Sequence, residues 1–218
     1  MADFSMFNAG DTNALLERAA QGDHHVLGEL LQRDRRRLHR MVALRLDPRL
    51  QGRIDPSDVI QEAQLEACDR LDEYLHNPTM PFFLWLRLIT GQRLLTLHRR
   101  HLNAKRRTVT RELSLNRGPL PQATSAALAA QLLGRLTRPS EAAIRAEIKS
   151  RLHLALEQMD PIDREVLTLR HFEQLTTSET ALELGINEEA TKKRHIRALK
   201  RLKVILTGAD DSSHEESQ

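Results

Sequence analysis

The chain has 218 residues, enough for one or two domains, and its 40% hydrophobic content is that of a globular protein. Because only 3% of the residues are aromatic, the cores must be built from Leu, Ile, Val and Ala, a composition that favours helices. The formal net charge is only +3, so where the charges lie matters more than their balance. A single cysteine, Cys68, excludes an internal disulfide, and no apolar run reaches the length of a membrane span. The N-terminus lacks a signal-peptide pattern, so we expect a soluble cytoplasmic protein with no membrane partner.

Turn and start signals predict two helical regions, residues 11–107 and 140–207, separated by a Gly- and Pro-containing linker at 108–139. Within this linker, the segment that begins at Thr124 can form a short helix. The first ten residues and the acidic tail at 208–218 are expected to be disordered. Nothing in the sequence is typical of a strand. The predicted fold is therefore all-α, with two small helical domains joined by a linker.

An acidic helix is predicted to begin at Asp55, where a capping aspartate precedes a proline suited to the first helical position. From Asp55 to Glu73 the sequence has seven acidic residues and one basic residue. Helical spacing predicts a core face made of Ile60, Ala63, Ala67, Leu71 and Tyr74. The opposite face carries Asp58, Glu62, Leu65, Asp69 and Asp72. An apolar leucine among acids is typical of a partner-binding patch, although a solvated face with one incidental leucine explains the pattern equally well.

The charge then reverses, with eight basic residues and no acid between Tyr74 and Arg111. A helix is predicted over 82–103, with its core side at Leu84, Leu88, Leu95 and Leu102, widened by Leu86, Leu94 and Leu97. The opposite face is predicted to carry Trp85, Gln92, Arg93, Thr96, Arg99, Arg100 and Asn103. Basic side chains, amides and a tryptophan on one face are the combination that binds a single nucleic-acid strand and stacks on its nucleobases. The alternative for Trp85 is a place in an aromatic packing cluster.

A helix-turn-helix motif is predicted near the C-terminus. A capping aspartate precedes a proline again at Asp160-Pro161, and Thr176 with Glu179 forms a capping box. Gly185, four residues after the small residue Ala181, suits the turn between two crossing helices. Asn187 is placed to cap the second helix, and Ile186 to fill the space between the two.

The second helix of this motif carries seven Lys or Arg residues and no acid after Glu189. Its core side is predicted to hold Thr191, His195, Ala198, Leu199 and Leu202. Lys193, Arg197 and Lys200 lie on the outer face, with Ala190 and Arg194 at its margin. Such a face has the charge and reach to contact phosphates and base edges in a major groove, whereas the alternative is a solvated basic surface.

These segments together resemble bacterial RNA polymerase sigma factors of the extracytoplasmic-function (ECF) group, in the sigma-70 superfamily. The resemblance is carried by "DPSDVIQEAQLEACDRLDEY", "FLWLRLITGQRLLTLHRR", "LEQMDPIDREVLTLRHFEQLTTSETALELGI" and the basic helix, in that order. It covers the chain from about Asp11 to Leu206. It implies a non-enzymatic subunit that binds core RNA polymerase, recognises promoter DNA and helps to melt it. The implied domains are a region 2-like bundle at 11–107 and a region 4-like domain at 140–207.

The resemblance also assigns roles to residues. Core polymerase binding falls on Asp58, Gln61, Glu62 and Leu65. Recognition of the minus-ten element, including capture of an extruded base, falls on the loop at 76–81 with Trp85, Gln92, Arg93, Thr96 and Arg100. Recognition of the minus-thirty-five element falls on Ala190, Lys193, Arg194 and Arg197. An anti-sigma factor is a further candidate partner, because many members of the family are held by one.

The sequence departs from the family pattern at Thr180, Thr191 and His195, which are polar where the family is usually apolar. Lys192-Lys193 is also more basic than usual. Two other functions compete with the sigma-factor hypothesis. One is a dimeric helix-turn-helix repressor or activator that binds a palindrome without polymerase. The other is a nucleic-acid-modifying enzyme that uses the basic helix to hold a single strand.

We expect no cofactor, metal or catalytic residue. The sequence has no glycine-rich phosphate loop and no nucleophile with a neighbouring base and orienting acid. The pair His98 and His101 lacks a nearby acid or cysteine, so a surface position is a better interpretation than a metal site.

Overall fold

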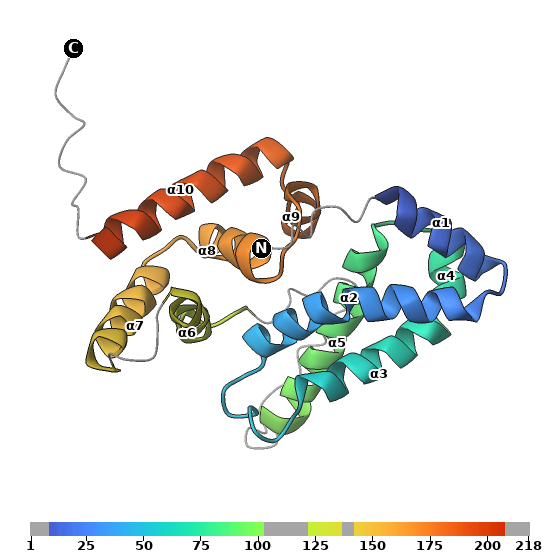
Figure 1. The fold of residues 1–218 in the computed structure, drawn as a ribbon, viewed down its shortest axis with the longest axis horizontal. Helices are drawn as coiled ribbons and strands as arrows, with labels where there is room; N and C mark the ends of the chain where they lie inside the picture. The colour runs from blue at the N-terminus through green and yellow to red at the C-terminus, as the bar shows by residue number, and fades with distance from the viewer. Residues whose placement is uncertain (1–8, 103–121, 137–141, 208–218) are drawn as a thin grey trace, which may run out of the picture. The chain divides into compact units, whose positions relative to one another are not determined.

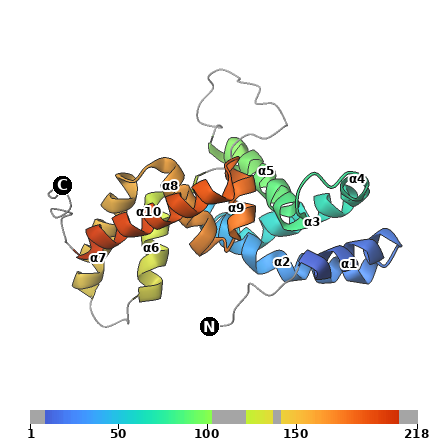
Figure 2. The same ribbon diagram turned by 90° about the horizontal axis from the view of Figure 1, so that it is seen from above.

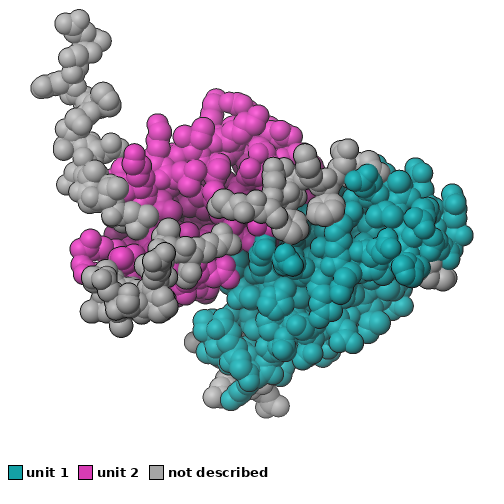
Figure 3. Space-filling view, viewed as in Figure 1, with its two compact units in different colours: residues 1–122 teal, residues 123–218 magenta. Residues whose placement is uncertain are grey.

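The computed structural model describes residues 9–102, 122–136 and 142–207. The chain divides into two compact units, residues 1–122 and 123–218, drawn in teal and magenta in Figure 3. The described residues form helices and, apart from one isolated bridge between Gln51 and Ile54, no strand pairing, which confirms the all-α prediction. No helix in these described ranges is long and apolar enough to cross a membrane.

Unit 1 is built around three helices that pack on one another. Helix α2 contacts α1, α3 and α5, and α3 contacts α5; α1 runs beside α2 in both ribbon views (Figures 1 and 2). Five fully buried residues from the three central helices form the middle of the core: Leu30, Leu38 and Met41 from α2, Ile60 from α3, and Leu94 from α5. The helices of this unit are α1 (Ala9–Ala20), α2 (His24–Arg45), α3 (Pro56–Asp69), α4 (Leu71–His76) and α5 (Phe82–Leu102).

The N-terminus of α3 is formed as the sequence predicts. The Asp55 carboxylate accepts a hydrogen bond of 2.7 Å from the Ser57 amide, and Pro56 is the first helical residue. The predicted core face of this acidic segment is confirmed, because Ile60, Ala63 and Ala67 of α3 and Leu71 and Tyr74 of α4 are all buried. Helix α1 begins at Ala9, inside the segment expected to be disordered.

The core face predicted for α5 is only partly right. Leu84, Leu86 and Leu94 are buried, but Leu88, Leu95 and Leu97 are partly exposed, and Leu102 has no described side-chain environment. The buried stripe instead runs through Leu86, Thr90 and Leu94, and the first two turns are buried nearly all the way round. The reason is that α5 packs against α2 and α3 while the aromatic ring of Tyr74 covers its N-terminal turns from another side.

Unit 2 contains the predicted helix-turn-helix. Helix α10 contacts α7, α8 and α9, and α6 contacts α7. Met159, Leu167 and Ala198 form a buried cluster with Leu202 packed against it. The elements are α6 (Ser125–Leu136), α7 (Ala142–Glu157), α8 (Pro161–Leu167), the π-helical turn η3 (Thr168–Phe172), α9 (Thr177–Leu184) and α10 (Glu188–Thr207).

Helix α6 confirms the short helix expected after Thr124, whose hydroxyl accepts a 3.1 Å hydrogen bond from the Ala127 amide. Leu128 and Ala129 are fully buried, and Ser125 accepts a hydrogen bond from Arg164 of α8. This helix, expected within the linker, therefore packs as part of unit 2. The first residues of the predicted helical region 140–207 lie outside the described residues, and α7 begins at Ala142.

Candidate functional sites

The acidic face of α3, defined by Asp58, Gln61, Glu62 and Leu65, is exposed along its whole length. The side of α3 that packs against α2 and α5 is the opposite, buried side. Leu65 is 62% exposed, a high value for a leucine on a helix with a well-formed core face. This arrangement confirms the predicted orientation of the face and leaves it available to a partner.

The outer face of α5 is less open than the sequence predicts. Arg99 and Arg100 are exposed, whereas Gln92, Arg93 and Thr96 are half-buried. Thr96 donates a hydrogen bond of 2.9 Å to the carbonyl of Gln92. The remaining predicted residue, Asn103, lies outside the described residues.

The expectation that Trp85 lies on the outer face is wrong. Its side chain is 7% exposed and stacks on Tyr74 of α4, with ring centroids 4.6 Å apart. Phe82 completes the cluster at 5.7 Å from both rings. The alternative interpretation, an aromatic packing cluster, therefore describes Trp85 correctly. The helical wheel failed here because it contains no information on α4, which covers this side of α5.

Trp85 nevertheless borders a cavity of about 740 Å³ in unit 1. The cavity lies where α3, α4, the 77–80 loop and α5 meet, and Tyr74 supports the loop by donating a 2.9 Å hydrogen bond to the Met80 carbonyl. Its lining combines aromatic rings, amides and charged groups, the surfaces that stack on a base and hydrogen-bond its edge. The lining residues are Glu66, Arg70, Glu73, Tyr74, Asn77, Thr79, Met80, Trp85, Leu88 and Gln92.

Only part of the cavity lining is predictable from the sequence. The 76–81 loop, Trp85 and Gln92 were predicted, whereas Glu66, Arg70 and Glu73 were not. Arg70 forms ion pairs with Glu66 at 3.4 Å and Glu73 at 3.5 Å. The one feature of the sequence that points to these three residues is that Arg70 is the single basic residue among seven acidic residues between Asp55 and Glu73.

Glu62 of α3 and Arg93 of α5 form an ion pair of 3.2 Å. The resemblance to ECF sigma factors implies different partners for these two residues, core polymerase for Glu62 and DNA for Arg93. The structure brings them together because α3 packs directly on α5. Both side chains keep substantial exposure, so solvent screens their attraction and the pair contributes little to stability.

The turn of the helix-turn-helix has the predicted local structure. Thr176 and Glu179 form the capping box, with hydrogen bonds of 3.1 and 2.7 Å. Gly185 ends α9 with φ of 65°, a left-handed conformation that glycine adopts at low cost. The Asn187 side chain accepts a 2.7 Å hydrogen bond from the Ala190 amide at the start of α10.

On α10, the basic face is divided between exposed and anchored residues. Lys193 and Lys200 are exposed, and Lys193 lies 3.8 Å from Glu189 one turn earlier. Ala190 is half-buried. Leu199 was predicted on the core side, but it is 39% exposed, since the part of α10 that packs on α7 and α8 is centred on Ala198.

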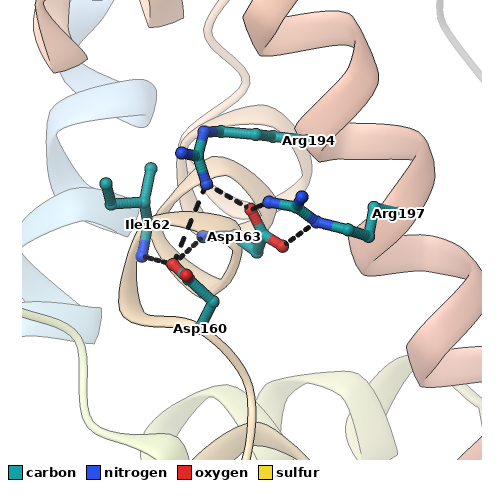
Figure 4. A network of polar contacts seen from close by, with 5 residues as sticks. All are labelled: Asp160, Ile162, Asp163, Arg194 and Arg197. Atoms are coloured by element: carbon teal, nitrogen blue, oxygen red, sulfur yellow. Dashed lines mark hydrogen bonds and ion pairs between the residues drawn. The ribbon is translucent and has the colours of Figure 1, made fainter.

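Arg197, predicted on the outer face, and Arg194, predicted at its margin, are both held by Asp163 of α8 (Figure 4). Arg197 donates from Nε to Oδ2 at 2.6 Å and from Nη2 to Oδ1 at 2.8 Å. Arg194 donates from Nη1 to Oδ1 at 2.9 Å. Burial raises the pKa of Asp163, but the hydrogen bonds from Arg197 and Arg194 outweigh it, so the pKa lies below its ordinary value and the carboxylate is ionised.

His195 of α10 meets His171 of η3, with the two Nε2 atoms 2.7 Å apart. Such a contact needs one ring to donate and the other to accept, so it requires at least one neutral imidazole. Burial, and then the charge of Arg170, lower the pKa of His195. The described part of the chain has no group of three His, Cys, Asp or Glu side chains that could hold a metal ion.

Comparisons with known proteins identify the family. The model for "Sigma-70, region 4" matches residues 155–204, which span α8, η3, α9 and most of α10. The ECF RNA polymerase sigma factor SigD of Mycobacterium tuberculosis is 27% identical over 199 residues, covering 91% of this chain and 85% of SigD. SigD of Mycobacterium bovis matches to the same extent. Residues 155–204 therefore match the region 4 family of sigma-70 factors, and the chain is similar to ECF sigma factors over 91% of its length.

The fold of the chain also agrees with that of a solved structure. The structure of CnrH in complex with the cytosolic domain of CnrY matches with a TM-score of 0.50 and 22% identity, over 90% of this chain and 97% of that chain. These similarities support a polymerase-associated sigma factor that acts in promoter recognition. Sigma factors as a family are transcription factors and not enzymes.

Proposed function

We propose that this sigma factor binds core RNA polymerase through the acidic face of α3 and directs it to promoters that it recognises at two elements. The observation that carries the proposal is the pairing, in one chain, of a basic helix-turn-helix with an aromatic cavity beside a basic helix. The first is suited to duplex DNA and the second to an unpaired base. A repressor needs only the first of these.

In this proposal, residues 11–107 act as the region 2-like domain and residues 140–207, together with α6, as the region 4-like domain, and the rest of 108–139 joins them. The cavity with Gln92 and the Arg93–Arg100 part of α5 takes the non-template strand of the minus-ten element. Lys193, Arg194, Arg197 and Lys200 of α10 contact the minus-thirty-five element, with Ala190 at its edge. An anti-sigma factor is a further candidate partner. The protein itself acts without catalysing a reaction.

Reconstitution with bacterial core polymerase tests the proposal. The full chain is mixed with core enzyme, the complex is isolated by gel filtration, and transcription is assayed on a library of promoter-length duplexes. We expect a stable complex that initiates from a defined subset of sequences. A dimeric repressor instead binds a palindrome by itself and yields neither a complex with core enzyme nor a transcript, and that outcome would refute the sigma-factor mechanism.

A further inference from the structure

Asp163 joins the two arginines of α10 to α8. It is the third residue of α8, placed there by the N-cap Asp160, whose side chain accepts hydrogen bonds from the Ile162 and Asp163 amides (Figure 4). The Asp163 side chain is 5% exposed, and the carboxylate accepts hydrogen bonds from both Arg194 and Arg197. A buried carboxylate needs such partners, because an unpaired buried charge is strongly unfavourable.

The contact with Asp163 uses only one edge of the Arg197 guanidinium. Nε and one N–H of Nη2 bind the carboxylate, which leaves the terminal edge formed by Nη1 and the second N–H of Nη2. Within the described parts of the chain, Nη1 of Arg197 has no hydrogen-bond partner. The side chain is 60% exposed. Arg197 therefore offers a second, solvent-facing pair of donors while its first pair is anchored.

A carboxylate beside DNA-binding arginines can act in two ways, by masking their charge or by fixing their orientation. The number of charges does not decide between the two, because Asp160 also lies 3.9 Å from Arg194 and two carboxylates therefore stand beside two guanidiniums. Masking, however, needs the reading edge to be covered, whereas the terminal edge of Arg197 is open. The geometry favours orientation, since a bidentate contact holds a long, flexible side chain in one rotamer before DNA arrives.

We propose that Asp163 is a positioning residue for base recognition. It holds Arg197 so that the terminal edge makes a bidentate contact with O6 and N7 of a guanine in the upstream promoter element, the commonest base-specific use of arginine. Asp163 touches no DNA itself. This inference rests on the proposed function, because it requires α10 to lie in a major groove.

The test measures base preference, which a merely structural role of Asp163 would not change selectively. Holoenzyme made with the full chain selects from promoter-length duplexes randomised in the upstream half, and sequencing gives the preference at each position. The wild type is expected to prefer guanine at one position that Arg197→Ala abolishes. Asp163→Asn should lower this preference by roughly fivefold or more, the lower end of what one bidentate pair contributes. Its affinity for a scrambled duplex should hold or rise, because a negative charge has been removed.

Asp160→Asn is the matched control. It removes the same charge from the same helix start, 3.9 Å from Arg194, but Asp160 makes no hydrogen bond or ion pair with Arg197 and acts on it only through its charge. Asparagine caps a helix about as well as aspartate, so α8 should persist. The guanine preference should remain as in the wild type. A preference lost equally in Asp160→Asn and Asp163→Asn would overturn the proposal in favour of a general charge effect.

A double variant tests whether Asp163 acts through Arg197. In the Arg197→Ala background, Asp163→Asn should cause no further loss of preference. Arg197→Lys provides a test that does not depend on the folding of Asp163→Asn. Lysine keeps the positive charge beside Asp163 but has no second edge, so the guanine preference should fall as in Arg197→Ala. A lysine variant with wild-type preference would overturn the proposal.

Two further outcomes separate this inference from the proposed function. If Asp163→Asn binds the selected sequence more tightly with its preference intact, the carboxylate masks charge and the positioning role is wrong. If the holoenzyme has an upstream preference that neither Arg197→Ala nor Asp163→Asn alters, the inference fails while promoter recognition stands. If no complex with core polymerase forms at all, the proposed function itself fails.

Discussion

Leu65 provides a direct test of the acidic face of α3. Leu65→Asp should weaken binding to core polymerase, because it puts a charge where the proposal needs an apolar contact. The helix content should change little, since exposed substitutions usually alter stability by under about 0.5 kcal/mol. Fluorescence titration against core enzyme measures the affinity. Ala14→Asp, on an exposed position of α1, is the control; equal affinities for both variants would remove Leu65 from the interface.

Glu62 is a less suitable residue for this test than its exposure indicates. Because it pairs with Arg93, Glu62→Lys puts two cations together across the contact between α3 and α5. A loss of binding could then come from a displaced helix and not from a missing contact. The ion pair also means that substitution of Arg93 alters the acidic face of α3 as well as the DNA-facing side of α5.

Gln92 provides a test of promoter opening at the cavity. Its side chain lines the cavity beside Trp85. Gln92→Ala holoenzyme should bind core enzyme and the upstream element normally but open promoters poorly. The loss of a stacking or edge contact is worth about 1–3 kcal/mol, comparable with the few kcal/mol that extrusion of a base requires.

Permanganate footprinting measures this opening on duplex and on pre-melted templates. The pre-melted template should restore only the part of the defect that comes from melting, and a loss from direct base contact should remain. Gln32→Ala, an exposed amide on α2 outside the cavity lining, is the control. Wild-type opening by Gln92→Ala would take the role away from the cavity.

At the scale of the elements, local hydrogen bonds explain why the helix-turn-helix tolerates two polar residues at positions where the family is usually apolar. Thr180 and Thr191 are fully buried, and their hydroxyls donate to the carbonyls of Thr176 and Asn187, one turn earlier, at 2.7 and 3.0 Å. Buried hydroxyls satisfied in this way cost little, so threonine can replace an apolar residue there. The motif keeps its geometry without an apolar residue at these two positions.

His195 differs from these two threonines, because burial and then the charge of Arg170 lower its pKa, so the stability of unit 2 should depend on pH. The pKa of His195 is lowered in the folded state, so below about pH 6.5 the unfolded chain takes up a proton that the folded protein does not. Stability should therefore fall as the pH decreases from about 6.5 toward the lowered pKa. Hydrogen exchange of α10 amides between pH 5 and 7.5, corrected for intrinsic rates, measures this dependence. His195→Gln should flatten it, and an unchanged profile would contradict the prediction.

At the scale of the whole molecule, α6 should behave as part of unit 2 and not as a piece of linker. Leu128 is fully buried, so Leu128→Ala should destabilise unit 2 by roughly 2–5 kcal/mol. Hydrogen exchange should then accelerate in α7, α8 and α10 but not in α2, α3 and α5. Leu154→Ala, at an exposed leucine of α7, is the matched control. Equal acceleration in both units would mean that they unfold together.

The sequence by itself determined the helical class, the faces of α3, and the starts of α3, α8, α9 and α10. These features depend on contacts between residues a few positions apart, such as Asp55 with Ser57 and Asn187 with Ala190. Capping groups and helical spacing act over one turn, and their geometry is nearly the same in any protein. For this reason a local pattern was enough to predict them.

Only the tertiary structure decided which predicted site residues are free and which are anchored. Trp85 is covered by Tyr74 of α4, Glu62 pairs with Arg93, and Asp163 contacts Arg197, 34 residues away along the chain. A helical wheel gives the direction of a side chain from its own axis but not which neighbouring helix lies there. Those neighbours are set by how whole helices pack, because burial and charge pairing depend on groups far apart in sequence.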